Sequence, residues 1–275
     1  RIKRLPGRLL LIGLPLTIAL GFVTGSLIYS DLSWIELALL ATMLAPTDAA
    51  LGQAVINNEA VPSSVREGLN VESGLNDGIC VPVLLLFLAI SAGSLDQGAV
   101  FTQMIELPLQ AIGIGAAVGI ASALIGCSSI NASVQRNWID GAWTQIPVIA
   151  LAVVCFAISQ WLGGSGFIAC FVGGLFFGGL IREQKQPLLK AADGTGDVLS
   201  MITWFIFGAL FIGDCLIAPE WRAILYAILS LSVVRMIPVF FSVIGMGLQT
   251  DSKLFMGWFG PRGLASIVFI VMVNE

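Results

Sequence analysis

Long apolar stretches dominate this sequence and constrain its fold most. Nine are long enough to cross the hydrocarbon core of a bilayer, which is about 30 Å thick and takes about 20 helical residues. The nine stretches are residues 9–28, 34–56, 68–90, 104–128, 144–162, 165–181, 199–217, 221–246 and 254–273. They are continuously apolar rather than alternating, which excludes a β-barrel. Only 11% of the residues are charged, against about 25% in soluble domains, so we predict an all-α polytopic membrane protein with about nine spans.

The basic residues predict an orientation for these spans. With residue 1 in the cytoplasm, ten of the 13 Lys and Arg residues fall in cytoplasmic loops and Arg222 alone falls outside. This asymmetry is typical of the positive-inside rule. We therefore expect an integral, multi-pass protein of the plasma (inner) membrane. Because the sequence starts in a loop and ends in an apolar stretch, we also expect a fragment of a longer chain.

A polar stripe interrupts the third apolar stretch. Glu72 and Asn76 are four residues apart, and so are Ser73 and Asp77. Each pair therefore shares one face of a helix, and the two faces adjoin. A carboxylate at mid-bilayer costs roughly 2.5–3.5 kcal/mol on insertion scales, so the stripe is predicted to have a function. The chain has no histidine, so any proton handling falls to carboxylates.

Two spans carry helix-breaking residues. Pro46 interrupts the second span within Ala45-Pro46-Thr47-Asp48, and Pro261 interrupts the ninth within Gly260-Pro261-Arg262-Gly263. Proline removes a backbone N–H and kinks or breaks a helix, and the freed carbonyls are tolerated only at buried or water-filled sites. Interrupted spans in both halves of a chain are typical of a transporter site near the bilayer midplane. A simple proline kink and an interfacial loop are the alternatives.

Arg235 lies deep in the eighth span. A buried arginine without a partner is very costly, so it needs a carboxylate. Glu72 is the natural candidate, because a fixed cation would neutralise Asp48 or Asp77.

The remaining polar groups suit a monovalent cation. Sodium prefers oxygen ligands, and Asp77, Asp48, Ser73, the Thr47 hydroxyl and backbone carbonyls near Pro46 offer them. Removal from water disfavours the charged form of a carboxylate, so Asp77 can hold a proton or a cation, but not both. A cation channel would need a lined pore, and a sodium-coupled solute symporter would need a larger polar cleft. The sequence offers one compact polar cluster instead.

Together, these motifs resemble the monovalent cation:proton antiporters, in the sodium/proton exchanger branch (NhaP-like and NHE-like). The resemblance rests on Ala-Pro-Thr-Asp at 45–48, Glu-Ser-Gly-Leu-Asn-Asp-Gly at 72–78, the buried Arg235 and Gly-Pro-Arg-Gly at 260–263. Order, spacing and local context match over residues 34–90 and 221–273. Residues 104–217 match in span number and character alone.

The resemblance implies a fold and an assembly. It implies an inverted-repeat bundle with two interrupted, crossing helices. Residues 1–103 would form the first part of the ion-transport core. Residues 104–220 would form a linker helix and a dimerisation scaffold, and residues 221–275 the second part of the core. The expected partners are the lipid bilayer and a second copy of the chain, with no nucleic acid and no organic substrate.

The resemblance also implies roles for individual residues. Asp77 would bind the proton and the cation, and Na+ would sit at Asp77 and Asp48. Further roles would be oxygen ligands (Thr47 and Ser73), site orientation (Asn76), a structural ion pair (Glu72 with Arg235) and the helix breaks (Pro46, Pro261 and Arg262). Pro261 departs from the family, where an apolar residue is common.

The expected function is therefore an antiporter that exchanges sodium, or another monovalent cation such as potassium, for protons in pH homeostasis. It would not be an enzyme, and it would need no cofactor beyond the transported Na+ and H+. Because Asn76 cannot ionise and Arg235 stays charged, we predict electroneutral exchange of one proton for one sodium.

Overall fold

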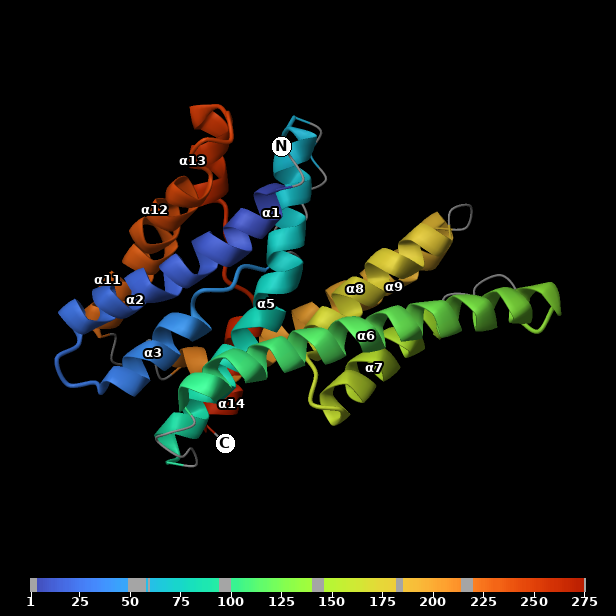
Figure 1. The fold of residues 1–275 in the computed structure, drawn as a ribbon, viewed down its shortest axis with the longest axis horizontal. Helices are drawn as coiled ribbons and strands as arrows, with labels where there is room; N and C mark the ends of the chain where they lie inside the picture. The colour runs from blue at the N-terminus through green and yellow to red at the C-terminus, as the bar shows by residue number, and fades with distance from the viewer. Residues whose placement is uncertain are drawn as a thin grey trace. The chain divides into compact units, whose positions relative to one another are not determined.

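The structure, a computed structural model, describes residues 4–48, 58, 60–93, 100–139, 146–181, 185–213 and 220–274. In these ranges the ordered elements are helices (Figure 1). Packing divides the chain into two units, one of residues 1–100 with 204–275 and one of residues 101–203. The predicted boundaries at 103 and 220, with their core and scaffold roles, stay a prediction.

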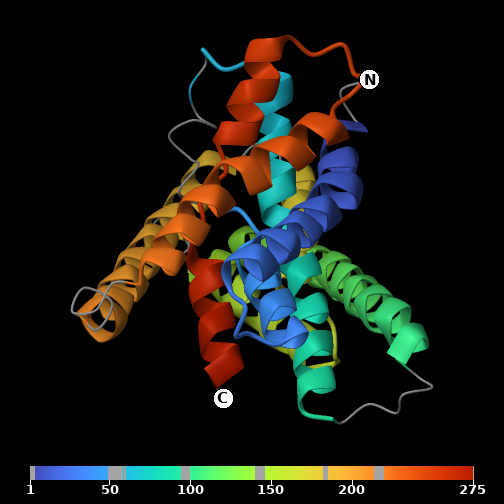
Figure 2. The ribbon, with the colours of Figure 1, turned by 90° about the vertical axis from the view of Figure 1, so that its left-hand side faces the viewer.

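The first unit contains the polar motifs. Its elements are α1 (Leu5–Arg8), η2 (Leu9–Gly13), α2 (Leu14–Ile28), α3 (Trp34–Met43), α5 (Ser63–Ser91), η4 (Gly208–Ile212), α11 (Trp221–Leu231), α12 (Val233–Ser242), α13 (Thr250–Trp258) and α14 (Leu264–Asn274). The first three continue into one another, and η2 and η4 are single π-helical turns. In this unit α2 packs against α3, α11 and α12, whereas α14 packs against α3 and α5 (Figure 2). These contacts gather α3, α5 and α14 and place α12 beside α2.

Local sequence signals account for where these helices start and stop. Ser33 and Glu36 form a capping box at the start of α3, in which the Ser33 hydroxyl accepts the Glu36 N–H and the Glu36 carboxylate accepts the Ser33 N–H. This arrangement satisfies two backbone donors that a helix start leaves unpaired. α3 then ends at Met43, shortly before Pro46. The chain also leaves the helical conformation between Trp258 and Leu264, around Pro261.

The eighth span bends at a place that the sequence analysis did not predict. Ser232 separates α11 from α12 with φ −109° and ψ −91°. Its hydroxyl donates to the Ile228 carbonyl at 2.6 Å, and serine back-bonding of this kind bends helices.

The second unit is built from α6 (Val100–Gln135), α7 (Ile146–Trp161), α8 (Gly166–Leu180) and most of α9 (Lys185–Phe207). α7 and α8 pack against each other as a hairpin. Its turn uses Gly163 in the left-handed region, at φ +79°, which glycine adopts without steric cost. The hairpin therefore consists of two helices, as expected for stretches five and six, rather than one broken helix.

The all-α membrane fold is confirmed, but the predicted span count is not. Within the described residues, five helical stretches are long and apolar enough to cross a membrane, and four further apolar helices are shorter. The predicted number of nine is therefore not confirmed. α5 begins at Ser63 rather than at residue 68, and α6 extends beyond both ends of the predicted 104–128. Residues 49–56, the last part of span two, lie outside the described residues.

Candidate ion-binding site

The two interrupted spans meet through Asp48. Its backbone N–H donates to the Pro261 carbonyl at 2.9 Å. Its carboxylate oxygen Oδ2 accepts the N–H of Leu264, the first residue of α14, at 3.0 Å. A carboxylate at a helix N-terminus satisfies a free donor and is stabilised by the helix dipole. Asp48 therefore caps a helix that begins more than two hundred residues later.

Arg262, in the second helix break, binds the backbone of the first break just after the end of α3. Its guanidinium donates to the carbonyl oxygens of Ala45 at 2.8 Å and Pro46 at 3.1 Å. A third bond reaches the Ser230 carbonyl in α11 at 3.2 Å. The carbonyls that Pro46 was expected to free for a cation therefore already accept hydrogen bonds from a side chain of the second break.

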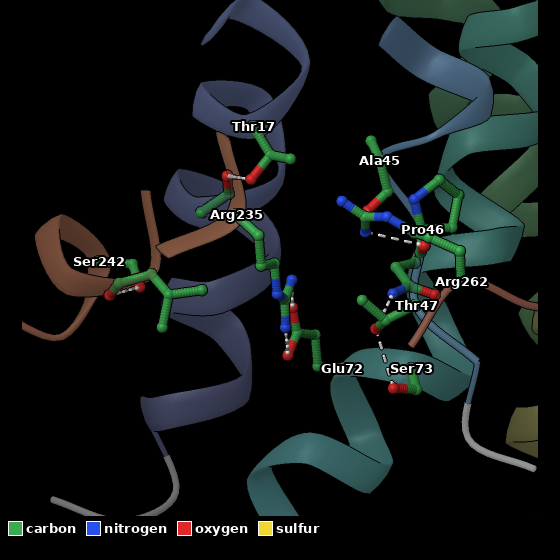
Figure 3. A network of polar contacts seen from close by, with 12 residues as sticks. Thr17, Ala45, Pro46, Thr47, Glu72, Ser73, Arg235, Ser242 and Arg262 are labelled. Atoms are coloured by element: carbon green, nitrogen blue, oxygen red, sulfur yellow. Dashed lines mark hydrogen bonds and ion pairs between the residues drawn. The ribbon is translucent and has the colours of Figure 1, made fainter. Parts of the chain in front are cut away.

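Thr47 joins the crossing to α5. Its hydroxyl lies 3.0 Å from the Ser73 hydroxyl (Figure 3). The same hydroxyl accepts the Asn76 side-chain N–H at 2.8 Å. All three side chains are buried. Thr47 is thus the polar link that fixes the extended segment 45–48 against the polar stripe.

Glu72 and Arg235 form a bidentate ion pair. The Arg235 nitrogens donate to the two Glu72 carboxylate oxygens at 2.6 and 2.9 Å (Figure 3). Each side chain is only 3% exposed. The structure thus brings together the two residues that the sequence pairs, and the parallel fork is the strong geometry for arginine and carboxylate.

Asp77 lies one residue beyond this network on α5. Its Oδ1 atom is buried, and within the described ranges it has no hydrogen-bond partner. The same holds for Oδ1 of Asn76. The negative charge of the Asp48 carboxylate is close enough to repel a negative charge on the Asp77 carboxylate. Two buried oxygen atoms, on consecutive residues of α5, are therefore without a hydrogen-bond donor within the described ranges.

Two glycines permit this close packing. A Cβ atom on Gly260 would stand 2.7 Å from Nε of Arg235 and 3.0 Å from a Thr47 methyl carbon. A Cβ atom on Gly263 would overlap the Asp48 carboxylate. Contacts under 3.0 Å force a neighbour to move, so both glycines allow the crossing rather than merely interrupting a helix.

The structure gathers all the predicted site residues into the first unit and adds further ones. Sequence reasoning missed Ser266, whose hydroxyl donates to the Met43 carbonyl at 2.9 Å and so closes the end of α3. As a lone polar residue in the apolar run 264–273 it carried a usable signal. It also missed the Ser230 carbonyl, for which the sequence holds no signal, because any residue type offers a carbonyl.

Comparison with known proteins places the chain in a family. The family described as "Sodium/hydrogen exchanger, transmembrane" matches residues 1–275. The chain belongs to this family. The sodium/hydrogen exchanger family consists of membrane transporters, so the antiporter resemblance and the expectation that the chain is not an enzyme are confirmed. The expectation of an integral, multi-pass membrane protein is likewise confirmed.

Individual relatives have names that differ in the cation. The K(+)/H(+) antiporter NhaP2 of Shewanella baltica is 25% identical over 242 residues, covering 88% of this chain and 41% of that protein. The K(+)/H(+) antiporter NhaP of Alkalimonas amylolytica is 26% identical, covering 86% and 40%. Sodium/hydrogen exchanger 7 of Arabidopsis thaliana is 23% identical, covering 100% and 25%. The chain therefore spans less than half the length of these relatives.

A solved structure supports the exchanger fold. The sodium proton antiporter MjNhaP1 from Methanocaldococcus jannaschii at pH 8 matches with a TM-score of 0.76 and 18% identity. The match covers 97% of this chain and 67% of that one. At this identity it establishes the α-helical antiporter fold alone.

Proposed function

We propose that the intact protein exchanges a monovalent cation for protons, with Asp77 as the group that carries either ion. The buried Oδ1 atom of Asp77 carries this proposal, because within the described residues no protein donor satisfies it. An oxygen atom left in that state costs on the order of 1–3 kcal/mol, and more when it is charged. A bound proton or cation removes that cost.

The charges of the site support one ion at a time. It contains two guanidinium groups, on Arg235 and Arg262, and three carboxylates, on Glu72, Asp48 and Asp77. The first two carboxylates are held by Arg235 and by the start of α14. With two positive and three negative groups, the charge balances when Asp77 carries one proton or one monovalent cation. We infer electroneutral exchange of one proton for one cation.

The proposed cation ligands are oxygen atoms near Asp77. They are the carboxylates of Asp77 and Asp48 and the hydroxyls of Thr47 and Ser73, as the sequence proposes, together with the free Oδ1 of Asn76. Asn76 would thus hold Thr47 through its nitrogen and face the cation with its oxygen. Oxygen ligands suit both sodium and potassium.

Sodium is the cation that the sequence proposes, and potassium is the second candidate. The two bacterial relatives are named as K(+)/H(+) antiporters, and the plant and archaeal proteins are named for sodium. We further propose that the protein forms a homodimer in the plasma (inner) membrane, with residue 1 in the cytoplasm. These statements rest on the resemblance and the Lys and Arg distribution.

A transport assay tests the function. The intact protein is placed in proteoliposomes that enclose an acidic buffer and a pH dye, and sodium or potassium is added outside without any organic solute. Wild type should release the trapped protons, and Asp77→Asn should not. Asp251→Asn, the same change at an exposed position of α13, should behave as wild type. Full exchange by Asp77→Asn would overturn the proposal.

The same vesicles test the stoichiometry. With fixed pH and cation gradients, an imposed membrane potential should leave the flux-reversal point unchanged, because no net charge moves. A reversal point that shifts with voltage would show that a second proton is carried, and electroneutral exchange would be wrong.

A further inference from the structure

Two thiols in the second unit face one cavity. The cavity has a volume of about 110 Å³ and lies among α6, α7 and α8. Its lining includes Cys155 of α7 and Cys170 of α8, with Leu151, Gly173 and Phe177 around them. Both thiols are free, and Cys155 is 3% exposed. The exchange site of the first unit uses neither of them.

The two thiols are close to one another. Cys170 Sγ donates to the Ala152 carbonyl at 3.4 Å, and Ala152 lies three residues before Cys155 on α7. Residues three apart share a helix face, so the Cys170 side chain reaches the face of α7 that carries Cys155. The two thiols therefore border the same cavity from neighbouring helices.

The lining selects what can bind. Among the described residues, the lining has no charged side chain, and besides the thiols its one polar side chain is that of Ser122. A charged complex would be costly in such surroundings. Two thiolates carry two negative charges, so a divalent ion gives a neutral complex and a monovalent ion gives an anion. Sulfur ligands favour soft metals.

We propose that Cys155 and Cys170 form a two-thiolate site for mercury(II). Mercury(II) is soft and divalent, and it is satisfied by two sulfur ligands in a line. The step balances as Hg²⁺ plus two thiols giving one Hg(S–Cys)₂ group and two protons, with no change of oxidation state. Zinc(II) also gives a neutral pair, but it takes four ligands, which the cavity does not supply. Silver(I) and copper(I) would leave a net negative charge.

Thiol counting in the wild-type protein tests the site without any mutation. The intact protein in detergent is treated with one equivalent of HgCl2, washed with an excess of a small monothiol, unfolded and labelled with a maleimide. Peptide mass spectrometry should find Cys155 and Cys170 both unlabelled and the other three cysteines labelled. Zinc(II) or silver(I) in place of mercury should leave both labelled after the wash. Labelling of Cys155 and Cys170 after mercury treatment would overturn the proposal.

Single alanine variants test whether the two thiols act together. In Cys155→Ala or Cys170→Ala, the remaining thiol should lose mercury to the monothiol wash on the order of 100-fold more readily, because the second sulfur no longer acts at a high effective concentration. Cys127→Ala, a buried cysteine of α6 that does not line the cavity, should retain mercury as wild type does. Equal retention in wild type and both cavity variants would show independent thiols and contradict the site.

Discussion

The carboxylate of Asp48 accepts the backbone N–H of Leu264 at 3.0 Å, so a residue of one broken span caps the helix that follows the other break. Asp48 N–H also donates to the Pro261 carbonyl. The two breaks thus satisfy each other's backbone groups, as buried non-helical backbone in a membrane requires. The same carboxylate is one of the proposed cation ligands.

Two variants of Asp48 should separate its capping role from its charge. Asp48→Asn keeps an oxygen acceptor for Leu264 and loses the charge near the helix start, so thermal stability should fall by about 0.3–1 kcal/mol. Asp48→Ala loses the cap as well, at a further cost of about 0.5–2 kcal/mol. Both should strongly weaken cation binding. Equal stability of the two variants, measured by thermal unfolding without cation, would show that Asp48 does not act as a cap.

Gly263→Ala should disrupt the crossing, because its Cβ would overlap the Asp48 carboxylate. We expect lower thermal stability and weaker cation binding together, since both depend on where Asp48 sits. The control is Gly174→Ala in α8, where a Cβ would meet nothing within 4 Å. That change should stabilise the helix by roughly 0.5–1 kcal/mol. A Gly263→Ala protein as stable as wild type would contradict the observed close approach.

Glu72 and Arg235 should behave as one unit in a double-mutant cycle. Glu72→Ala and Arg235→Ala each leave one buried charge without its partner, which costs on the order of 3–5 kcal/mol. The double variant removes both charges, so its loss of stability should be clearly smaller than the sum of the two single losses. Thermal unfolding in detergent provides the readout. Additive losses would mean that the pair is not coupled.

Thr47→Val should loosen α5 from segment 45–48. The change keeps the shape of the side chain but removes the hydroxyl that contacts Ser73 and accepts from Asn76. Leaving these buried groups unpaired costs about 1–3 kcal/mol. Thr47→Ser retains the hydroxyl and should restore most of the stability and the cation affinity. A valine variant as stable as wild type, or a serine variant as impaired as the valine variant, would contradict the role of the hydroxyl.

Much of the first unit could be predicted because unpaired charges and broken helices are costly inside a membrane. The cost of burying Arg235 predicted its pairing with Glu72, and Pro46 predicted the end of α3. The partner of the Leu264 N–H could not be predicted in this way. It depends on where α14 starts and on the crossing of two segments distant in sequence, and neither leaves a pattern in the local residues.

The use of backbone carbonyls was also beyond sequence reasoning. Pro46 predicted freed carbonyls near the cation, but Arg262 reaches those of Ala45 and Pro46. Arginine can pair with a carboxylate or cap a helix end, and the sequence does not distinguish the two. The bend at Ser232 was missed for a related reason, since serine in an apolar helix often causes no bend.

Proton release on cation binding tests the central claim most directly, because it asks whether a proton and a cation compete for Asp77. Sodium or potassium is titrated into the intact, weakly buffered protein near neutral pH while the released protons are measured. If both ions share Asp77, wild type should release up to about one proton per cation bound, and the apparent cation affinity should fall as the pH is lowered. Asp77→Asn should release none. Undiminished proton release from Asp77→Asn, or cation binding to wild type that is independent of pH, would contradict the account.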